Sequence, residues 1–353
     1  MKIRASNEIY GIQILRGIAS LSVVFHHVLE ESSGAKYPFS PEWLTTSAAS
    51  GVDIFFVISG FIMLHTTFRS GRAPLSPGTF LLRRASRIYP LYWVCCGLML
   101  SLMLAGFMRH RLIGPTDLIL SLALLPSSAL VIGVSWSLVY EACFYIVFAG
   151  SLFFQSARTS VAVTTGVIVC AVIASGRLGA TVLSGFFSNP IPIEFAIGLW
   201  IALWQSQRSA AGRPWPISAL WAAPAFAALA LAPLFVAHPN TNGLTGWPRI
   251  LAWGLPSALI VAAVARPGAP SGRIARSLVF LGDASYALYL THPFVMIAYA
   301  VLLHNRVFSA APQVAIAPLI ALLAVVVGVG AHVTIEKPLM GLVRHATRRL
   351  TRA

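Results

Sequence analysis

The chain has 353 residues, of which 57% are hydrophobic and only 10% charged, and its formal net charge is +15. A soluble domain needs roughly a quarter of its residues charged, so this composition excludes a water-soluble globular protein. The basic residues do not indicate nucleic-acid binding either, because they form short clusters between apolar runs instead of covering one face.

Apolar stretches recur from residue 9 to residue 335, and each is about long enough as a helix to cross a hydrocarbon core of roughly 30 Å. Unpaired amides cannot be left in hydrocarbon, and the runs lack period-two alternation, so we expect helices. The fold is predicted to be an all-α, polytopic membrane helical bundle of about ten transmembrane helices. The predicted spans are residues 9–29, 51–67, 88–108, 137–154, 161–176, 191–205, 217–237, 249–265, 285–303 and 314–335.

The distribution of basic residues predicts the orientation of the chain. With both termini in the cytoplasm, 19 of the 25 Lys and Arg residues fall on the cytoplasmic side. Such a bias is typical of inner loops. We therefore expect a multi-pass protein of the cell (inner) membrane with both termini cytoplasmic. Six basic residues fall outside: Lys36, Arg109, Arg111, Arg177, Arg249 and Arg306.

One further apolar stretch, residues 117–133, is interrupted by Pro126, Ser127 and Ser128. Counting it as a full span would invert every later loop and remove the charge bias, so we expect it to be re-entrant or partly buried. A single membrane-embedded domain, residues 1–353, with a basic cytoplasmic tail, residues 344–353, accounts for the whole chain. All four cysteines fall inside predicted spans without metal-ligand spacing, so neither disulfides nor a metal site is expected.

The first span carries two ionisable residues of interest. Arg16 and His27 are eleven residues apart, which places them about 20° apart around a helix and roughly 16 Å apart along it. Charged groups inside a membrane are costly and mark functional candidates. The alternative is that both side chains snorkel to the two membrane surfaces. His26 points elsewhere and is expected to be structural.

The second and fourth spans each place a carboxylate near the depth of His27. Asp53 lies near the outer end of the segment GVDIFFVISGF, where it is either a site residue or the cap of its helix. Glu141 lies about one turn below the outer surface in SWSLVYEACFY. A Glu141–His27 pair would fix the imidazole tautomer of a general base, although a structural ion pair between helices is the alternative.

The segment FLLRRASRIYPLYW places Arg83, Arg84 and Arg87 at the inner edge of the third span. Arginine forks suit phosphates, but such a run is also typical of any boundary facing anionic lipids. Later, GDASYALYLTHPF puts Asp283 at the inner edge and His292 inside the ninth span. His292 either lines the same cavity or bonds a carbonyl freed by Pro293.

Together these stretches and the closing IEKPL at residues 335–339 resemble the acyltransferase 3 family of membrane O-acyltransferases, in its exopolysaccharide O-acetyltransferase-like branch. The resemblance runs nearly end to end. It implies a ten-span enzyme that moves an acyl group, most simply acetyl, from cytoplasmic acyl-CoA to a hydroxyl of a cell-surface or lipid-linked glycan. The expected partners are acyl-CoA, that polysaccharide or glycan acceptor and membrane lipids, with no nucleic acid and no permanently bound cofactor.

The resemblance also implies roles for particular residues. His27 would be the catalytic histidine, Glu141 the acidic residue of the active site, and Arg16 the motif partner of His27. Arg84 and Arg87 would bind the acyl-CoA, and Arg16 is expected to contribute to that binding. Asp53 is expected to be a further catalytic residue. A transporter or flippase without acyl-transfer chemistry is the rival function, because polar residues in spans and basic inner loops also describe transporters.

Overall fold

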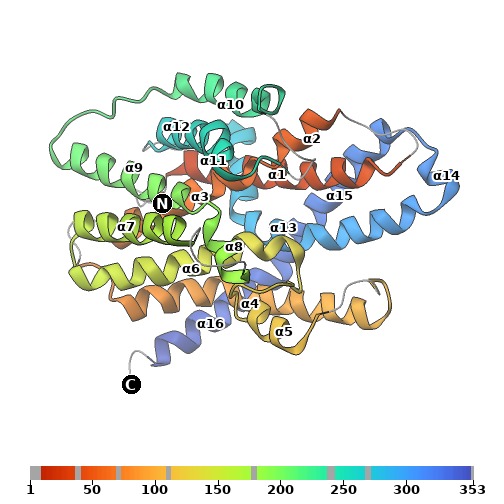
Figure 1. Ribbon diagram of the computed structural model, residues 1–353, viewed down its shortest axis with the longest axis horizontal. Coiled ribbons are helices and arrows are strands. Elements are labelled where there is room, and N and C mark those ends of the chain that lie inside the picture. Colours follow the sequence, from red (N-terminus) through yellow and green to blue (C-terminus); the bar gives the residue numbers. More distant parts are fainter. Residues whose placement is uncertain are drawn as a thin grey trace.

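The computed structural model describes residues 9–35, 41–68, 73–108, 113–175, 181–236, 243–266 and 272–350, with side chains as far as residue 343. All regular secondary structure in these ranges is helical (Figure 1). The long helices are α1 (Tyr10–Ser32), α3 (Gly51–Thr67), α4 (Pro77–Leu104), α6 (Trp136–Ser151), α7 (Ala157–Ser175), α9 (Ile193–Ala210), α13 (Gly272–Leu303) and α15 (Gln313–Ala331). The shorter helices are α2 (Glu42–Ala48), α5 (Pro115–Leu122), α8 (Val182–Ser188), α10 (Ala222–Leu231), α11 (Gly246–Arg249), α12 (Leu255–Val264), α14 (Arg306–Ser309) and α16 (Lys337–Leu350). The predicted all-α bundle is confirmed.

All ten predicted spans coincide with helices, although their lengths differ. Among the described residues, eight helical segments are long and apolar enough to cross a membrane, and the pair α8 and α9, bent by 41°, makes a ninth. The seventh predicted span corresponds to a shorter apolar helix, Ala219–Leu234. The chain is therefore a multi-pass membrane protein.

The apolar stretch at residues 117–133 does not form a crossing helix. It contains most of the eight-residue helix α5 and then a non-helical segment that leads to a short 3-10 turn at Gly133–Ser135. Eight helical residues extend only about 12 Å, well short of a bilayer core. The predicted basic tail begins inside α16; its side chains from residue 344 and its last three residues lie outside the described part of the chain.

Two helix pairs form the packed centre of the bundle: α1 lies along α13, and α3 lies along α9. A Cβ atom on Gly60 would lie 2.0 Å from the carbonyl oxygen of Phe195, and one on Gly282 would lie 1.9 Å from that of Gln13. Only glycine permits these approaches, which let the helix backbones come into contact.

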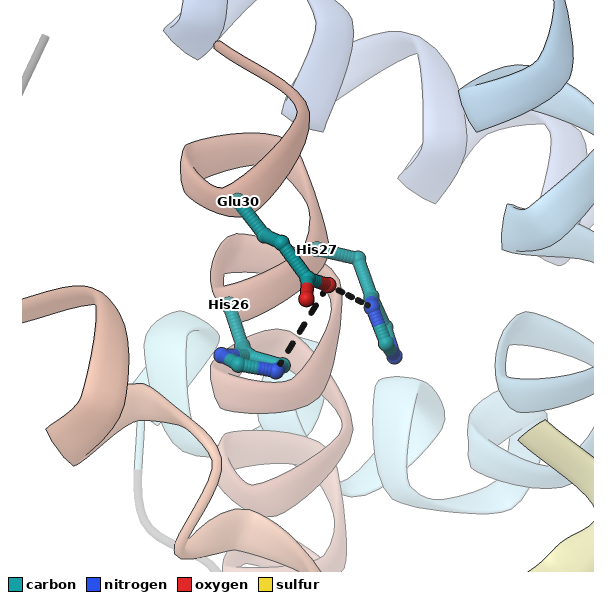
Figure 2. Close-up of side chains that lie close together, drawn as sticks. All are labelled: His26, His27 and Glu30. Atoms are coloured by element: carbon teal, nitrogen blue, oxygen red, sulfur yellow. Dashed lines mark hydrogen bonds and ion pairs between the residues drawn. The ribbon is translucent and has the colours of Figure 1, made fainter. Parts of the chain in front are cut away.

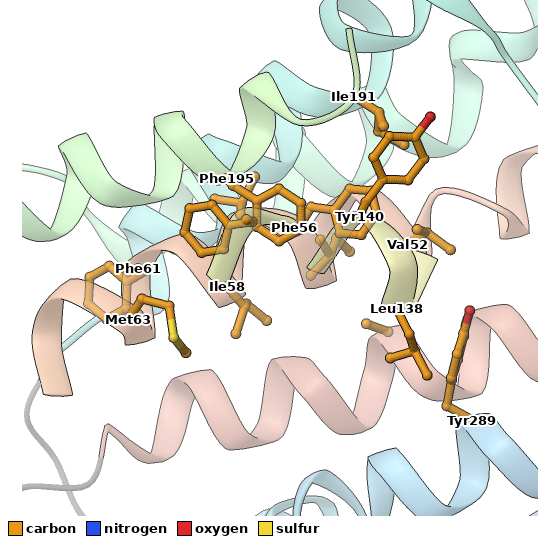
Figure 3. Packing of buried hydrophobic residues seen from close by; sticks show 14 of the residues in the cluster. Val52, Phe56, Ile58, Phe61, Met63, Leu138, Tyr140, Ile191, Phe195 and Tyr289 are labelled. Atoms are coloured by element: carbon orange, nitrogen blue, oxygen red, sulfur yellow. The ribbon is translucent and has the colours of Figure 1, made fainter. Parts of the chain in front are cut away.

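Aromatic side chains fix α6 against the α3–α9 pair (Figure 3). The ring of Phe56 lies 4.5 Å from that of Phe195 and 6.3 Å from that of Tyr140, measured between centroids. Phe144 stacks on the other side of Phe195, also at 4.5 Å. Such ring contacts stabilise the packing beyond what burial of the rings alone contributes. They hold α3 and α6 in fixed relation, and these two helices supply most of the cavity described next.

Candidate active site

A cavity of about 110 Å³ lies between helices α1, α3, α4, α6 and α13 and is called here the central cavity. Its apolar lining residues come mainly from α3 and include Phe55, Ile58 and Ile62. The cavity is also lined by polar side chains. Its polar lining residues are Arg16, Ser59, Arg84, Arg87, Ser137, Glu141, Tyr145, Ser285, Tyr286 and Tyr289. Four of the six predicted site residues, namely Arg16, Arg84, Arg87 and Glu141, therefore meet in one cavity.

Glu141 supplies the carboxylate of the central cavity. It accepts a hydrogen bond of 3.0 Å from the hydroxyl of Ser59 and another from the hydroxyl of Tyr145. Among the described residues, no hydrogen bond or ion pair joins Glu141 to His27. The predicted Glu141–His27 pair is therefore not formed, because the hydroxyl groups of α3 and α6 hold Glu141 within the cavity.

Arg16 on α1 and Arg84 on α4 both line the central cavity. The Arg16 guanidinium donates to Ser285 at 2.9 Å and to Gln13 at 3.2 Å. Arg84 donates to Thr66 at 3.2 Å, and its guanidinium lies 5.5 Å from the ring centroid of Phe80. These contacts fix both guanidinium groups, so Arg16 does not simply extend to a membrane surface, which was the alternative for Arg16 and His27.

A second cavity of about 300 Å³ adjoins the N-terminal part of α4 and is called here the entry cavity. Its lining residues are Thr66, Thr67, Ala73, Leu75, Phe80, Arg83 and Arg84. Arg84 lines both cavities. Its Nε and the hydroxyl of Thr67 are buried, and neither has a hydrogen-bond partner among the residues that the structure describes. Buried polar groups usually have a partner, so these two atoms are suited to a polar ligand.

His27 lies near the C-terminal end of α1, where it forms a cluster with His26 and Glu30 (Figure 2). Its Nδ1 lies 3.1 Å from Oε2 of Glu30. His26 instead bonds through Nδ1 to the backbone carbonyl of Thr45 at 2.8 Å, and its Nε2 lies 3.9 Å from the same Glu30 oxygen. The bond to Thr45 agrees with the structural role predicted for His26.

Two aromatic side chains of α13 connect His27 to the central cavity. The ring of His292 stacks on that of His27, with 5.1 Å between centroids and 22° between planes. The ring of His292 also lies 5.9 Å from that of Tyr289, which lines the central cavity. The Tyr289 hydroxyl donates to the carbonyl of Val134, so Ser137 donates to that hydroxyl at 2.7 Å.

His292 itself is completely buried and bonds through Nδ1 to the carbonyl of Leu288, 3.2 Å away. One sequence reading expected His292 to bond the carbonyl that Pro293 frees; that carbonyl belongs to Tyr289, whereas the imidazole bonds the carbonyl of Leu288. His292 does not line the central cavity. It separates that cavity from His27.

Asp53 lies apart from both cavities. Its two carboxylate oxygens each accept a bond of 2.8 Å from Arg249, and the pair is buried. Asp53 was expected to share a site with His27, but its partner in the structure is Arg249. The carboxylate is in the first turn of α3, but Ser50 occupies the cap position and Asp53 makes no cap bond.

The His26, His27 and Glu30 cluster is also the group of described residues that comes closest to metal-binding geometry. One nitrogen or oxygen atom from each lies within 4.8 Å of the other two. Bonds of about 2.0–2.2 Å to a zinc ion would require every pair to lie within roughly 4.2 Å, so the cluster would have to contract. The spacing favours hydrogen bonds over metal coordination.

Residues 9–333 match the acyltransferase domain family. The chain belongs to the acyltransferase 3 family. This acyltransferase is 32% identical over 325 residues to the exopolysaccharide production protein ExoZ of Rhizobium meliloti, covering 87% of this chain and 93% of ExoZ. It is 27% identical over 375 residues to the acyltransferase MdmB of Streptomyces mycarofaciens, covering 93% of this chain and 90% of MdmB. No solved structure matches it.

Family membership makes the protein a membrane acyltransferase, so the rival function, a transporter without acyl-transfer chemistry, does not hold. Sequence reasoning missed several residues of the acyltransferase's polar interior. Glu30 stands three residues after His27, a helical spacing that brings side chains together, and could have been found. Arg249 was assigned to an outer loop, and Glu194, a fully buried carboxyl group near Asp53 and Arg249, was not considered.

Proposed function

We propose that this acyltransferase moves an acyl group, acetyl in the simplest case, from a cytoplasmic acyl-CoA to a hydroxyl of an exopolysaccharide or its lipid-linked glycan precursor. The enzyme would lie in the cell (inner) membrane among its lipids, with both termini cytoplasmic. The printed name of ExoZ, an exopolysaccharide production protein, supports the class of acceptor. The bias of basic residues toward one side of the membrane supports the orientation.

The main support for the proposal is that Arg84 lines both cavities. This residue connects an entry cavity with basic walls to a central cavity that is lined in part by apolar residues. Coenzyme A has phosphates at one end and a thioester on a long, thin arm. Guanidinium groups bind phosphate oxygens through paired hydrogen bonds. Arg83 and Arg84 would hold the phosphates, and the arm would pass Arg84 toward Glu141.

The two substrates would meet near Tyr289. The donor thioester would reach the central cavity from the cytoplasmic side, and the glycan hydroxyl would reach His27 from the outer side. Tyr289 and His292 stand between these positions. Movement of both rings would join the two positions. Ser137 donates to the Tyr289 hydroxyl in this structure, and after release of that bond its hydroxyl would donate to the thioester oxygen as negative charge develops there.

The chemistry requires one base and no permanently bound cofactor. His27 would take the proton of the glycan hydroxyl as the oxygen forms a bond to the thioester carbonyl carbon. The carbon–sulfur bond would then break, and the departing thiolate would take the proton from the His27 imidazolium. The products are a glycan ester and free coenzyme A, so atoms and charge balance.

The acyl content of the surface polysaccharide tests the proposal. We expect deletion of the gene to remove an O-acyl group from the polysaccharide and the wild-type gene to restore it. His26→Ala should also restore it, whereas His27→Ala should not, with membrane expression verified for each. An unchanged polysaccharide in the deletion strain would contradict the proposed acceptor. Restoration by His27→Ala would contradict the assigned base.

A further inference from the structure

Glu30 and His27 form the shortest polar contact of the histidine cluster. Oε2 of Glu30 lies 3.1 Å from Nδ1 of His27, and the two residues are three positions apart on α1 (Figure 2). A carboxylate is only an acceptor when ionised, so the hydrogen of this bond is on the histidine nitrogen. The neutral imidazole therefore has its hydrogen on Nδ1 and its lone pair on Nε2.

Nε2 is the atom that a general base uses in this arrangement. In Figure 2 the far nitrogen of His27 points away from Glu30. The imidazolium that forms after proton transfer would carry its positive charge beside the Glu30 carboxylate. A histidine is an effective base when a carboxylate binds one ring nitrogen and the other nitrogen is left to accept the substrate proton.

The ring of His27 is also held from the side. His292 stacks on it at 5.1 Å, and His292 is completely buried and bonded to the backbone of its own helix. Glu30 thus fixes the edge of the His27 ring while His292 supports its face. Both restraints limit rotation of the imidazole, which a base needs in order to meet its substrate in one geometry.

His26 and Glu141, the other two side chains that could orient His27, have different partners. His26 bonds Thr45 through Nδ1, and its Nε2 is 3.9 Å from Glu30, too far for a hydrogen bond. Glu141 receives its bonds from Ser59 and Tyr145 in the central cavity. Neither of these side chains is placed to orient His27.

We propose that Glu30 is the positioning residue of His27, and so performs the role that the sequence assigned to Glu141. This proposal rests on the proposed function, because it assumes that His27 is the base. Glu30 would select the Nδ1-protonated tautomer and stabilise the imidazolium during transfer. Glu141 would act separately, within the cavity of the donor.

Transfer from radiolabelled acetyl-CoA into glycan tests the role of Glu30. The assay uses inside-out membrane vesicles of the deletion strain, which supply their own acceptor, with each variant expressed at a measured level. We expect Glu30→Ala to lower kcat between about 10- and 10⁴-fold, as for other carboxylates that orient a histidine, while KM for acetyl-CoA changes less than about twofold. Glu30→Asp should recover part of the loss. Glu31→Gln, the neighbouring carboxylate, is the matched control and should resemble wild type.

The double variant Glu30→Ala with His27→Ala distinguishes positioning from structural support. If Glu30 acts through His27, the double variant should be no slower than His27→Ala alone, because residues that act as a unit are not additive. A further loss, or a fall in Tm for Glu30→Ala, would make Glu30 structural and overturn the proposal.

Three other outcomes are also decisive. Wild-type rates in Glu30→Ala, with His27→Ala inactive, would overturn only the role of Glu30. Full activity in His27→Ala would overturn the assignment of the base in the proposed function as well. Loss of wild-type transfer in EDTA that Zn²⁺ restores would show that the cluster holds a metal ion, and would also overturn the proposal; we expect EDTA to have no effect.

Discussion

Asp53 and Arg249 are 196 positions apart in the sequence, yet they form a two-pronged ion pair in the bundle, with both hydrogen bonds at 2.8 Å. Arg249 also lies over the rings of Trp136 and Trp253, with 5.9 and 5.2 Å to their centroids. The pair therefore ties the first turn of α3 to the end of α11 and to the first residue of α6. These contacts favour a structural role for Asp53 over the catalytic role that the sequence suggested.

Breaking this pair should destabilise the protein. Asp53→Asn leaves the Arg249 charge buried without its partner and should lower the free energy of unfolding by about 3–5 kcal/mol. Tm of the purified protein in detergent measures the loss. Replacing both residues, Asp53→Leu with Arg249→Met, should recover most of it, because no unpaired charge remains. A normal Tm with lost transfer in Asp53→Asn would instead place Asp53 among the catalytic residues.

Arg84 should affect the binding of the donor more than the chemical step. Arg84→Gln removes the charge shared by the entry and central cavities and should raise KM for acetyl-CoA about 10- to 100-fold, the value of one or two charge-assisted hydrogen bonds. Initial rates of transfer over a range of acetyl-CoA concentrations measure this. Arg208→Gln, on α9, should leave KM unchanged. An unchanged KM in Arg84→Gln would remove Arg84 from the donor site.

Loss of the Glu141 charge should lower kcat. Glu141→Gln keeps the size of the side chain and its bond from Ser59 but removes the negative charge among Arg16, Arg84 and Arg87. We expect kcat to fall by about 10²-fold or more, since electrostatic groups at a reacting centre contribute on this scale. Ser59→Ala should lower kcat less, because the Tyr145 bond remains. Equal loss in both variants would indicate that packing, not charge, is the contribution of Glu141.

The sequence predicted most of the fold because membrane spans are encoded locally. Each apolar run had to be helical, and all ten runs are. The contacts between side chains of different helices were harder to predict. Sequence position gives the depth of a residue in the membrane but not the direction in which its side chain points around the helix. Glu141 and His27 were placed at similar depths, yet the Glu141 carboxylate points into the central cavity and His27 toward Glu30. Arg249 was assigned to a loop because its span was predicted to begin there.

Gly60 provides a test of the packing on which the cavity walls depend. A methyl group at this position would lie 2.0 Å from the carbonyl oxygen of Phe195, so α3 and α9 would have to separate. Gly60→Ala should therefore lower the free energy of unfolding by about 1–3 kcal/mol. Thermal unfolding monitored by circular dichroism measures this. Gly97→Ala is the matched control, since nothing lies within 4 Å of the added methyl group. A normal Tm in Gly60→Ala would mean that the two helices pack less closely.

The most direct test of the proposed acyl transfer uses the purified enzyme in sealed vesicles with the deletion strain's glycan inside. Radiolabelled acetyl-CoA is added outside, to the side that carries the enzyme's cytoplasmic face. We predict that wild type and His26→Ala place label on the enclosed glycan and that His27→Ala does not, with equal protein and equal Tm in all three. Label transferred equally by His27→Ala, or no transfer by the wild type, would contradict the proposed acyl transfer across the membrane.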